Sequence, residues 1–332
     1  MQAVVITRYG GPEVMALTER PAPAVGPRDV LIAVRAASLN PIDYKLRQGK
    51  AKVVLTPSFP IGLGCDVAGV VIAVGPAVTR CAVGDAVFAR LEKDRMGGLA
   101  HQVAADEAVV ARRPAAGSWG EAAAIPLAGL TALQALREVA QVQPGQRVLI
   151  QAGAGGVGTL AIQIAKHLGA WVATTTSGKN AQLVRSLGAD QVIDYTQGPA
   201  GAQVGDLDVV LDTLGAGSEP ASLAMCRPGG VVVGLSGMPD AAFAQAHLPA
   251  ALRPVVWLAT RGRRRAAARS GATFRYLFMR PDGAMLAELA AWVDAGVVRP
   301  IIHRSFPLAQ FRDAFAELEG GHARGKIVVT VP

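Results

Sequence analysis

A short apolar strand runs directly into a glycine-rich loop in the middle of this 332-residue chain. Residues 147–158 read RVLIQAGAGGVG, and Gly153, Gly155 and Gly158 have the GxGxxG spacing. In that spacing the first glycine permits a tight turn, the second lets the backbone approach a pyrophosphate, and the third lets the next helix pack closely. Backbone N–H groups at the helix start form the anion site. The loop residues expected to bind a dinucleotide are Gly153, Ala154, Gly155, Gly156, Val157 and Gly158.

The residues around the loop predict a doubly wound parallel sheet. Apolar residues between 157 and 168 recur at helical spacing, and Gly169 closes that helix. Strand-like runs follow at 171–175, 191–193, 208–211 and 231–233, separated by segments long enough for crossover helices. This alternation is typical of an α/β domain with a parallel sheet. The competing interpretation is an ordinary glycine turn in another kind of α/β domain.

The end of the second strand bears on the choice of cofactor. NAD sites usually carry an acidic residue there, about 20 residues after the loop, which binds the ribose 2′-hydroxyl. Residues 174–180 read TTTSGKN and contain no acid. Hydroxyl groups and the Lys179 cation suit a 2′-phosphate, so the sequence favours NADPH over NADH. The alternative is that Lys179 and Asn180 only begin a solvated helix. Asp212 and Leu235 end the fourth and fifth strands, where such a sheet presents its ligand crevice.

The first part of the chain has a different pattern. Residues 1–118 contain alternating apolar residues and short apolar runs punctuated by Gly and Pro, which predicts a β-rich domain. Three motifs lie within it, at residues 39–45 (LNPIDYK), 64–71 (GCDVAGVV) and 83–85 (VGD). By residue chemistry alone, Asn40-Pro41 is a turn, and the residues that follow could be an exposed helix start.

With these motifs in this order, nearly the whole chain resembles the medium-chain dehydrogenase/reductase superfamily. The resemblance is to its zinc-free quinone oxidoreductase branch, which includes zeta-crystallin and NADPH-dependent alkenal reductases. It implies an α/β protein with a GroES-like β-rich catalytic domain at 1–118, completed by 297–332. It further implies a Rossmann domain at 119–296, and within this the segment 238–270 matches the family least. We expect that segment to be a flap or a subunit contact.

The resemblance also implies functional residues. Asn40, Asp43, Tyr44 and Lys45 would line the catalytic cleft near the nicotinamide. Ser177, Lys179 and Tyr195 would hold the adenosine 2′-phosphate. Near the C-terminus, Lys326 is a further candidate for neutralising cofactor phosphate, although a lysine beside a strand could equally be an exposed charge.

Ligands for zinc are missing at the positions where the zinc-dependent branch carries them. That branch places a Cys where this chain has Asn40, and a Gly-His-Glu triplet where it has Gly64, Cys65 and Asp66. The chain has three cysteines, no CxxC motif and five scattered histidines, so we predict no metal site. Cys65 and Asp66 could in principle belong to a remodelled site, but a small buried thiol is the more usual role.

Without a metal, the most accessible reduction is that of a conjugated acceptor. Hydride addition to a quinone or to an α,β-unsaturated aldehyde or ketone delocalises the developing charge, so hydrogen-bond donors suffice. We therefore predict an NADPH-dependent quinone or enone reductase. Asn40, Tyr44 or Lys45 would act as donors, and Tyr44 or water would supply the proton. The alternatives are an enoyl-thioester reductase and a non-catalytic NADPH-binding protein that serves in regulation or RNA contact.

Composition sets the remaining expectations. Half of the residues are apolar, which suits two sizeable domains. Unpaired cysteines and the lack of a signal-peptide pattern or apolar span predict a cytoplasmic protein with no membrane partner. The net charge of +8 and the basic run at 261–269 could indicate binding to nucleic acid or to an anionic membrane, but no nucleic-acid module accompanies them and such runs usually mark solvated faces. By analogy with the family, we expect a homodimer acting on a small-molecule substrate.

Overall fold

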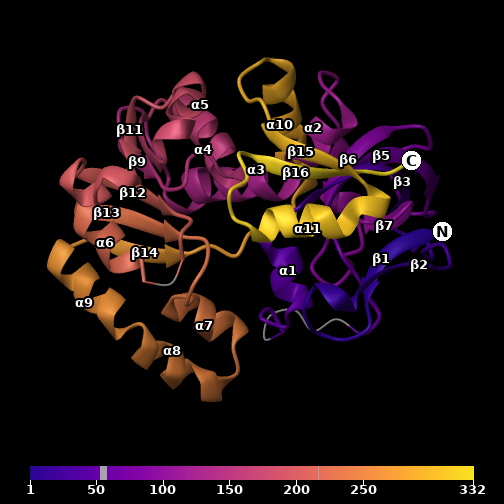
Figure 1. Cartoon of the computed structure of the whole chain (residues 1–332), viewed down its shortest axis with the longest axis horizontal. Helices are drawn as coiled ribbons and strands as arrows, with labels where there is room; N and C mark the ends of the chain where they lie inside the picture. The colour runs from indigo at the N-terminus through magenta and orange to yellow at the C-terminus, as the bar shows by residue number, and fades with distance from the viewer. Residues whose placement is uncertain (53–57, 216) are drawn as a thin grey trace. The chain divides into compact units, whose positions relative to one another are not determined.

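The computed structural model describes residues 1–52, 58–215 and 217–332 (Figure 1). It divides into two compact units, one formed by residues 1–130 and 280–332 and the other by residues 131–279. The first unit is rich in β-strands, and the second is built on a parallel sheet, so the fold is α/β as predicted.

The bounds of these units differ from the expected ones at 118 and 296. Helix α2 (Trp119–Ala123) packs on strands of the first unit, and helix α10 (Gly283–Asp294) packs on strand β8 (Val110–Arg112). Both helices therefore belong to the first unit. Helix α3 (Pro126–Leu133) begins in the first unit and ends in the second.

The first unit contains a three-stranded and a seven-stranded sheet. The small sheet has the order β2-β1-β4, and the large one has the order β15-β16-β3-β5-β6-β8, with β7 paired to β3. The remaining elements of this unit are β1 (Gln2–Ile6), β2 (Met15–Glu19), β3 (Asp29–Leu39), α1 (Pro41–Arg47), β4 (Ile61–Gly62), β5 (Asp66–Val74), β6 (Ala86–Arg90), β7 (Gln102–Asp106), β15 (Ile302–Pro307), α11 (Phe311–Glu319) and β16 (Lys326–Thr330).

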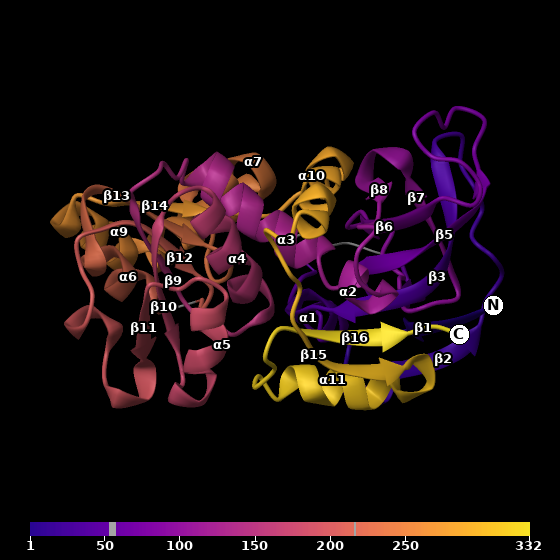
Figure 2. The ribbon, with the colours of Figure 1, turned by 90° about the horizontal axis from the view of Figure 1, so that it is seen from above.

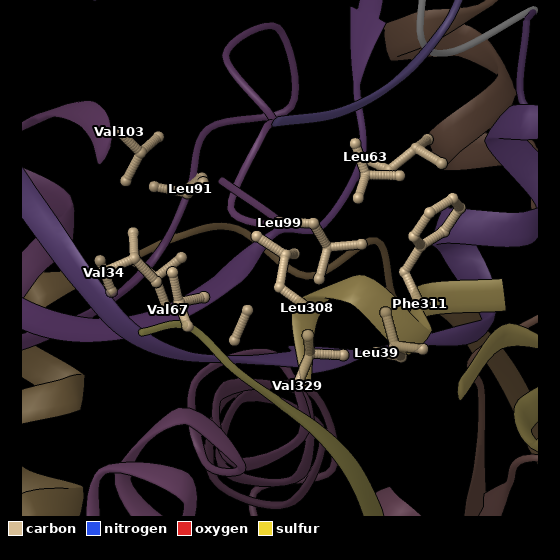
Figure 3. Close-up of a cluster of buried hydrophobic side chains, with 14 of the residues drawn as sticks. Val34, Leu39, Leu63, Val67, Leu91, Leu99, Val103, Leu308, Phe311 and Val329 are labelled. Carbon is tan, nitrogen blue, oxygen red and sulfur yellow. The ribbon is translucent and has the colours of Figure 1, made fainter. Parts of the chain in front are cut away.

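The core of the first unit joins residues from both ends of the sequence. Figure 3 shows Val34, Val67 and Val103, from the three paired strands β3, β5 and β7, gathered with Leu308 and Val329 from the C-terminal segment. All five side chains are buried. Strand β16 pairs with β3 in antiparallel register, with Ile327 opposite Leu39. The C-terminal segment is thus an integral part of the first unit.

The second unit has a six-stranded sheet in which every pairing is parallel. Its order is β11-β10-β9-β12-β13-β14, which is the 3-2-1-4-5-6 order of a dinucleotide-binding Rossmann sheet. The strands are β9 (Arg147–Ile150), β10 (Trp171–Thr176), β11 (Gln191–Asp194), β12 (Leu207–Asp212), β13 (Cys226–Gly234) and β14 (Thr273–Tyr276). The predicted parallel sheet is confirmed.

Helices cover both faces of this sheet (Figures 1 and 2). Helices α4 (Gly156–His167) and α5 (Ala181–Ser186) lie on one face, and α6 (Glu219–Met225) and α9 (Arg261–Ser270) lie on the other. The segment expected to form a flap consists largely of α7 (Ala241–His247), α8 (Arg253–Ala259) and α9. No helix in the described part of the chain combines the length and apolar character needed to cross a membrane.

Candidate active site

The predicted catalytic segment lies where β3 ends and α1 begins. Asn40 is the N-cap of α1, and Pro41 occupies the first helical position, where its missing N–H costs nothing. Asp43 closes a capping box, since its Oδ2 accepts a hydrogen bond from the Asn40 backbone N–H at 2.7 Å. Local sequence therefore fixes the helix start and the direction of the side chains that follow.

Asp43 itself is fully buried. The pKa of the Asp43 carboxyl is raised to about 7, mainly by burial and in part by the nearby Asp66 carboxylate, while the hydrogen bond from the Asn40 backbone N–H opposes the shift. Its Oδ1 has no hydrogen-bond partner among the described residues. The structure makes Asp43 a helix cap with no exposed surface, and its expected place in the cleft near the nicotinamide stays a prediction.

Next to Asn40 lies a second buried carboxylate, Asp66. Its Oδ2 accepts hydrogen bonds from Asn40 Nδ2 at 2.8 Å and from Ser38 Oγ at 3.1 Å. Its Oδ1 accepts from the backbone N–H of Leu127 at 2.9 Å. Buried carboxylates need such partners because an unpaired buried charge is very costly. Asp66 thereby holds the Asn40 amide in one orientation.

Lys326 supplies the positive charge of this cluster. Its ammonium donates to Asn40 Oδ1 and, at 2.9 Å, to the Leu39 carbonyl, and it lies 3.5 Å from Asp66 Oδ2. The side chain is only 4% exposed, so the alternative of an exposed surface lysine is wrong. Because its contacts lie around Asn40, its expected role in neutralising cofactor phosphate stays a prediction.

The polar groups around Asn40 are engaged with one another. Cys65 is buried, and burial together with the Asp43 and Asp66 carboxylates raises the pKa of its thiol well above the usual range. The Lys326 ammonium already holds the Asn40 oxygen and faces Asp66. In the described ranges, no group of three or more His, Cys, Asp or Glu side chains could hold a metal ion.

Tyr44 and Lys45 differ from Asn40 and Asp43 in being only partly buried. Burial lowers the pKa of the Lys45 ammonium, and the neighbouring Lys50 charge lowers it further. Neither side chain has a polar partner within the part of the chain that the structure describes. These two groups are thus the members of the predicted set that remain available to a ligand.

In the second unit, the glycine loop has the geometry of a nucleotide cradle. A Cβ on Gly153 would overlap Thr174 Oγ1, and a Cβ on Gly158 would lie 2.7 Å from Gly153 Cα. Both glycines are therefore required by the packing of the loop itself. A Cβ on Gly155 would meet only the Ala152 carbonyl oxygen, at 3.2 Å. The space above Gly155 is open, as expected if a ligand approaches the backbone there.

Helix α4 begins directly after Gly155, and no side chain caps its N-terminus. Ala152, just before the loop, has a φ of 50°, a left-handed conformation that non-glycine residues rarely adopt. Thr175 supports it, since Thr175 Oγ1 accepts from the Ala152 backbone N–H at 3.0 Å. The start of α4 offers free backbone N–H groups, and the turn at Ala152 is fixed by Thr175. Both features fit a bound pyrophosphate.

The residues expected to hold a 2′-phosphate follow the carboxyl ends of two neighbouring strands. Strands β10 and β11 pair with Thr176 opposite Asp194, so Ser177 and Tyr195 follow neighbouring strands at the same end. Ser177 is partly buried, and Tyr195 is exposed. Lys179 lies in the short 3-10 helix Gly178–Asn180 and is also exposed.

Asp194, which the sequence analysis did not consider, lies beside this group. Its Oδ1 accepts from Thr196 Oγ1 at 2.7 Å and from the Thr196 backbone N–H at 3.0 Å. These hydrogen bonds lower the pKa of the Asp194 carboxyl. A Cβ on Gly178 would lie 2.7 Å from Asp194 Oδ2. An acidic group is therefore present beside Gly178, contributed by the third strand instead of the second.

Asp212 and Leu235 meet where β12 and β13 end, since the Leu235 backbone N–H donates to the Asp212 carbonyl at 3.0 Å. The Asp212 carboxylate accepts from Ser218 Oγ and Ser222 Oγ, each at 2.8 Å. The hydrogen bonds from these two serines fix the loop that follows β12 to the Asp212 carboxylate. We therefore assign Asp212 a positioning role in the structure, while its predicted contact with cofactor stays a prediction.

The cluster around Asn40 was only partly visible in the sequence. Cys65 and Asp66 were noticed as positions of missing zinc ligands, and Lys326 as a possible phosphate neighbour. Their assembly joins residues up to 286 positions apart, as between Asn40 and Lys326. No local spacing connects them, and the one available signal was the matching order of motifs along the chain.

Known proteins with matching sequences and folds agree with this architecture. The Alcohol dehydrogenase GroES-like domain model matches residues 26–135, and the Zinc-binding dehydrogenase model matches residues 187–329. The chain is 35% identical over 364 residues to the NAD(P)H oxidoreductase RTN4IP1, mitochondrial, of Danio rerio, covering 100% of this chain and 91% of that protein. It is 36% identical to the NADPH-dependent alkenal/one oxidoreductase, chloroplastic, of Arabidopsis thaliana, covering 99% and 79%.

Among solved structures, the quinone oxidoreductase from Coxiella burnetii matches with a TM-score of 0.85 and 34% identity, over 100% of this chain and 99% of that one. The match spans both units, the β-rich one and the parallel sheet with its glycine loop. The fold, the geometry of the glycine loop and the sequence identity to several oxidoreductases all indicate the same family. The chain belongs to the medium-chain dehydrogenase/reductase family of oxidoreductases.

Proposed function

We propose that this enzyme uses NADPH to reduce a conjugated carbonyl compound, either a quinone or an α,β-unsaturated aldehyde or ketone. The observation that carries the proposal is the Asn40 cluster, in which the Lys326 ammonium lies between Asn40 and Asp66. Such a cluster provides a fixed positive charge and a fixed amide. Conjugated acceptors suit it because their developing negative charge is delocalised and needs only hydrogen-bond donors. Relatives named as an alkenal/one oxidoreductase and a quinone oxidoreductase agree with this substrate class.

When bound, a nicotinamide cofactor supplies the hydride. The open backbone at Gly155 and the uncapped start of α4 would hold its pyrophosphate. Ser177, Lys179 and Tyr195 would hold the 2′-phosphate that distinguishes NADPH. In this proposal the Lys179 charge attracts the phosphate and outweighs the Asp194 carboxylate, which would repel it.

Tyr44 and Lys45 are the donors that we assign to the acceptor oxygen. Both are partly buried and free of protein partners among the described residues. A lowered pKa makes the Lys45 ammonium a better proton donor near neutral pH, and the Tyr44 hydroxyl can donate a hydrogen bond or a proton. Asn40 acts as a positioning residue, because its amide is already committed to Asp66 and Lys326.

The test follows NADPH absorbance with purified protein and three acceptors: a 1,4-benzoquinone, an α,β-unsaturated ketone and crotonyl-CoA. We expect turnover with the first or second and a clear loss of kcat in Tyr44→Phe or Lys45→Met. Lys52→Met is the matched control, since Lys52 is exposed on the same segment and does not contribute to the pKa shift of Lys45. Turnover of crotonyl-CoA alone would favour the thioester reductase, and tight NADPH binding without turnover would favour a non-catalytic protein.

Cofactor preference is tested by titrating NADPH and NADH into the protein. Lys179→Ala is expected to weaken NADPH binding about tenfold with little effect on NADH, because only NADPH carries the 2′-phosphate. Asp194→Asn is expected to strengthen NADPH binding. Arg185→Ala, at an exposed position on α5, is the control for a general loss of charge. A preference of the parent protein for NADH would refute this part of the proposal.

The homodimer and the cytoplasmic location also remain proposals. Sedimentation velocity of the full chain tests the first, and localisation of a tagged chain in its own host cells tests the second.

A further inference from the structure

The net positive charge of this chain is concentrated in one segment. The chain has 33 Lys and Arg against 25 Asp and Glu. Between Asp240 and Asp282 there is no acidic residue and no lysine, but there are eight arginines: Arg253, Arg261, Arg263, Arg264, Arg265, Arg269, Arg275 and Arg280. The rest of the chain thus carries 25 basic and 25 acidic residues and is balanced. The full excess of +8 lies in a stretch that includes α8 and α9.

Helices α8 and α9 form a nearly continuous path along the outside of the second unit (Figure 1). Helical hydrogen bonds continue across the junction, from the Thr260 N–H to the Val256 carbonyl and from the Arg264 N–H to the Thr260 carbonyl, each 3.0 Å long. Val256, Thr260 and Ala266 are buried. The opposite side of the path faces solvent.

The exposed side of α8 is apolar. Val255, Trp257 and Leu258 are 58%, 62% and 57% exposed, and Leu252 at the start of the helix is 39% exposed. Large apolar side chains that are exposed this far seldom lie side by side on a protein without a binding role. Leu252, Val255 and Leu258 are three residues apart and lie along one face of the helix, and the exposed Trp257 lies next to Leu258. We call these four residues the apolar strip.

The exposed side of α9 is basic. Arg261, Arg265 and Arg269 are four residues apart, so they share one face of the helix, and all three are exposed. No described acidic side chain forms an ion pair with them. Arg263 and Arg264 have structural roles instead. Arg263 donates to the carbonyls of Met238 and Pro239, and Arg264 stacks over the Trp257 ring with 4.3 Å between the guanidinium carbon and the ring centre.

We propose that the apolar strip and the three outward arginines form a docking surface for an anionic lipid bilayer. Exposed apolar side chains beside a row of basic ones are the pattern of helices that lie in a membrane interface. The apolar strip would enter the headgroup region, while Arg261, Arg265 and Arg269 would contact lipid phosphates. This surface is peripheral, consistent with the lack of a spanning helix in the described residues.

Two other occupants suit this surface less well. A nucleic acid would use aromatic side chains for stacking, whereas three of the four apolar residues are aliphatic. A second copy of the chain in a symmetric dimer would bring the same arginine row against itself, which is repulsive. From the sequence, an anionic membrane was only an alternative for the basic run, since the run does not show which of its residues face outward.

The test measures co-sedimentation of the full-length protein with vesicles at 0.1 M NaCl. Vesicles of phosphatidylcholine alone are compared with vesicles containing 30% phosphatidylglycerol. We expect binding only to the anionic vesicles, and release at 0.5 M NaCl. Trp257 is the most exposed of the four tryptophans, so iodide quenches it readily in the free protein. Its contribution is obtained by subtracting the signal of Trp257→Phe. We expect this quenching to fall on binding, because the headgroup region would shield the ring from iodide.

Three variants identify the surface. Arg261→Gln/Arg265→Gln/Arg269→Gln is expected to weaken the partition coefficient roughly a hundredfold, since each basic residue near an anionic surface contributes about a factor of five. The control removes the same charge from exposed sites elsewhere, as Arg35→Gln/Arg80→Gln/Arg185→Gln, and is expected to bind nearly as the parent does. Val255→Ser/Leu258→Ser is expected to reduce binding without changing the net charge.

Several outcomes would overturn the proposal. Equal binding to both kinds of vesicle would show that charge does not drive binding. A loss of vesicle binding in the control variant as large as that in the Arg261, Arg265 and Arg269 variant would show that this surface is not the binding site. Unchanged binding of Val255→Ser/Leu258→Ser would leave only a nonspecific charge contact. Tighter binding to a single-stranded RNA than to anionic vesicles would assign the surface to nucleic acid. Conversion of a dimeric parent to a monomer by the serine variant would assign it to a second copy.

Discussion

Replacing Lys326 with methionine removes the ammonium group from the Asn40 cluster while keeping most of the aliphatic stem. The Asp66 carboxylate, which is fully buried, then loses the countercharge 3.5 Å away, and Asn40 Oδ1 loses its donor. Two unit charges at that distance attract by roughly 5 kcal/mol at an effective dielectric constant of about 20. Part of this is offset by the cost of burying the lysine, and breaking a buried pair on one side typically costs about 3–5 kcal/mol. We therefore expect Lys326→Met to lower the free energy of unfolding by about 3 kcal/mol.

A double-mutant cycle separates this pair from a general packing effect. Asp66→Asn alone leaves the ammonium without its carboxylate, whereas Lys326→Met/Asp66→Asn leaves no buried charge at either position. The double variant is expected to lose less than the sum of the two single losses, with a coupling of about 2 kcal/mol. Urea unfolding followed by circular dichroism gives the free energies, and kcat is measured in parallel.

The cycle also distinguishes two roles for Lys326. Additive losses, within about 0.5 kcal/mol, would refute the argument that the ammonium acts through Asp66. Additive losses together with weaker NADPH binding in Lys326→Met would instead support the expectation from sequence that this residue neutralises cofactor phosphate.

Three further predictions concern single positions. Gly153→Ala is expected to destabilise the protein by roughly 1–3 kcal/mol through overpacking, whereas Gly155→Ala, with a φ of −80° at that position, is expected to melt normally and to bind NADPH at least tenfold more weakly. Because burial raises the pKa of Asp43 to about 7 from its ordinary value of 3.8, the folded state keeps a proton that the unfolded state releases, so stability should fall as pH rises from about 4 to 7 and then level off. Asp43→Asn should flatten that slope in urea midpoints measured at pH 5 to 8, and an unchanged slope would contradict the assignment. Arg47→Met should cost about 3 kcal/mol in urea unfolding, since the buried Arg47 makes two hydrogen bonds of 2.9 and 2.8 Å to Glu319, and a loss below about 1 kcal/mol would show that this pair contributes little.

The second unit was largely predictable because its signals are local. Strand, glycine loop and helix follow one another within residues 147–168, and the remaining strands alternate with helices along the chain. Periodicity and turn residues depend only on near neighbours, so the sequence carries them directly. The parallel order of the sheet then follows from the handedness and length of the connections.

The Asn40 cluster was less predictable because it depends on distant residues. Lys326 approaches Asn40 through the pairing of β16 with β3, and nothing near either residue indicates that pairing. For the same reason Asp194 was overlooked: it belongs to the third strand and reaches the loop after the second only because β10 and β11 are neighbours.

Exposure was the third property that the sequence could not provide. Arg263 and Arg265 are two residues apart in one basic run, yet the first is buried and the second is exposed. The direction of each side chain is set by how the helix lies on its neighbours, which the run of arginines itself does not specify.

The discontinuity of the first unit has a consequence for synthesis of the protein. Residues 131–279 leave the ribosome with all six strands of their sheet, whereas the first unit still lacks β15 and β16. Until residues 326–330 emerge, β3 exposes the backbone edge from Ala36 to Leu39 that β16 later pairs. An open strand edge is a site for aggregation and mispairing, so we expect the nascent chain to depend on chaperones most strongly during this interval.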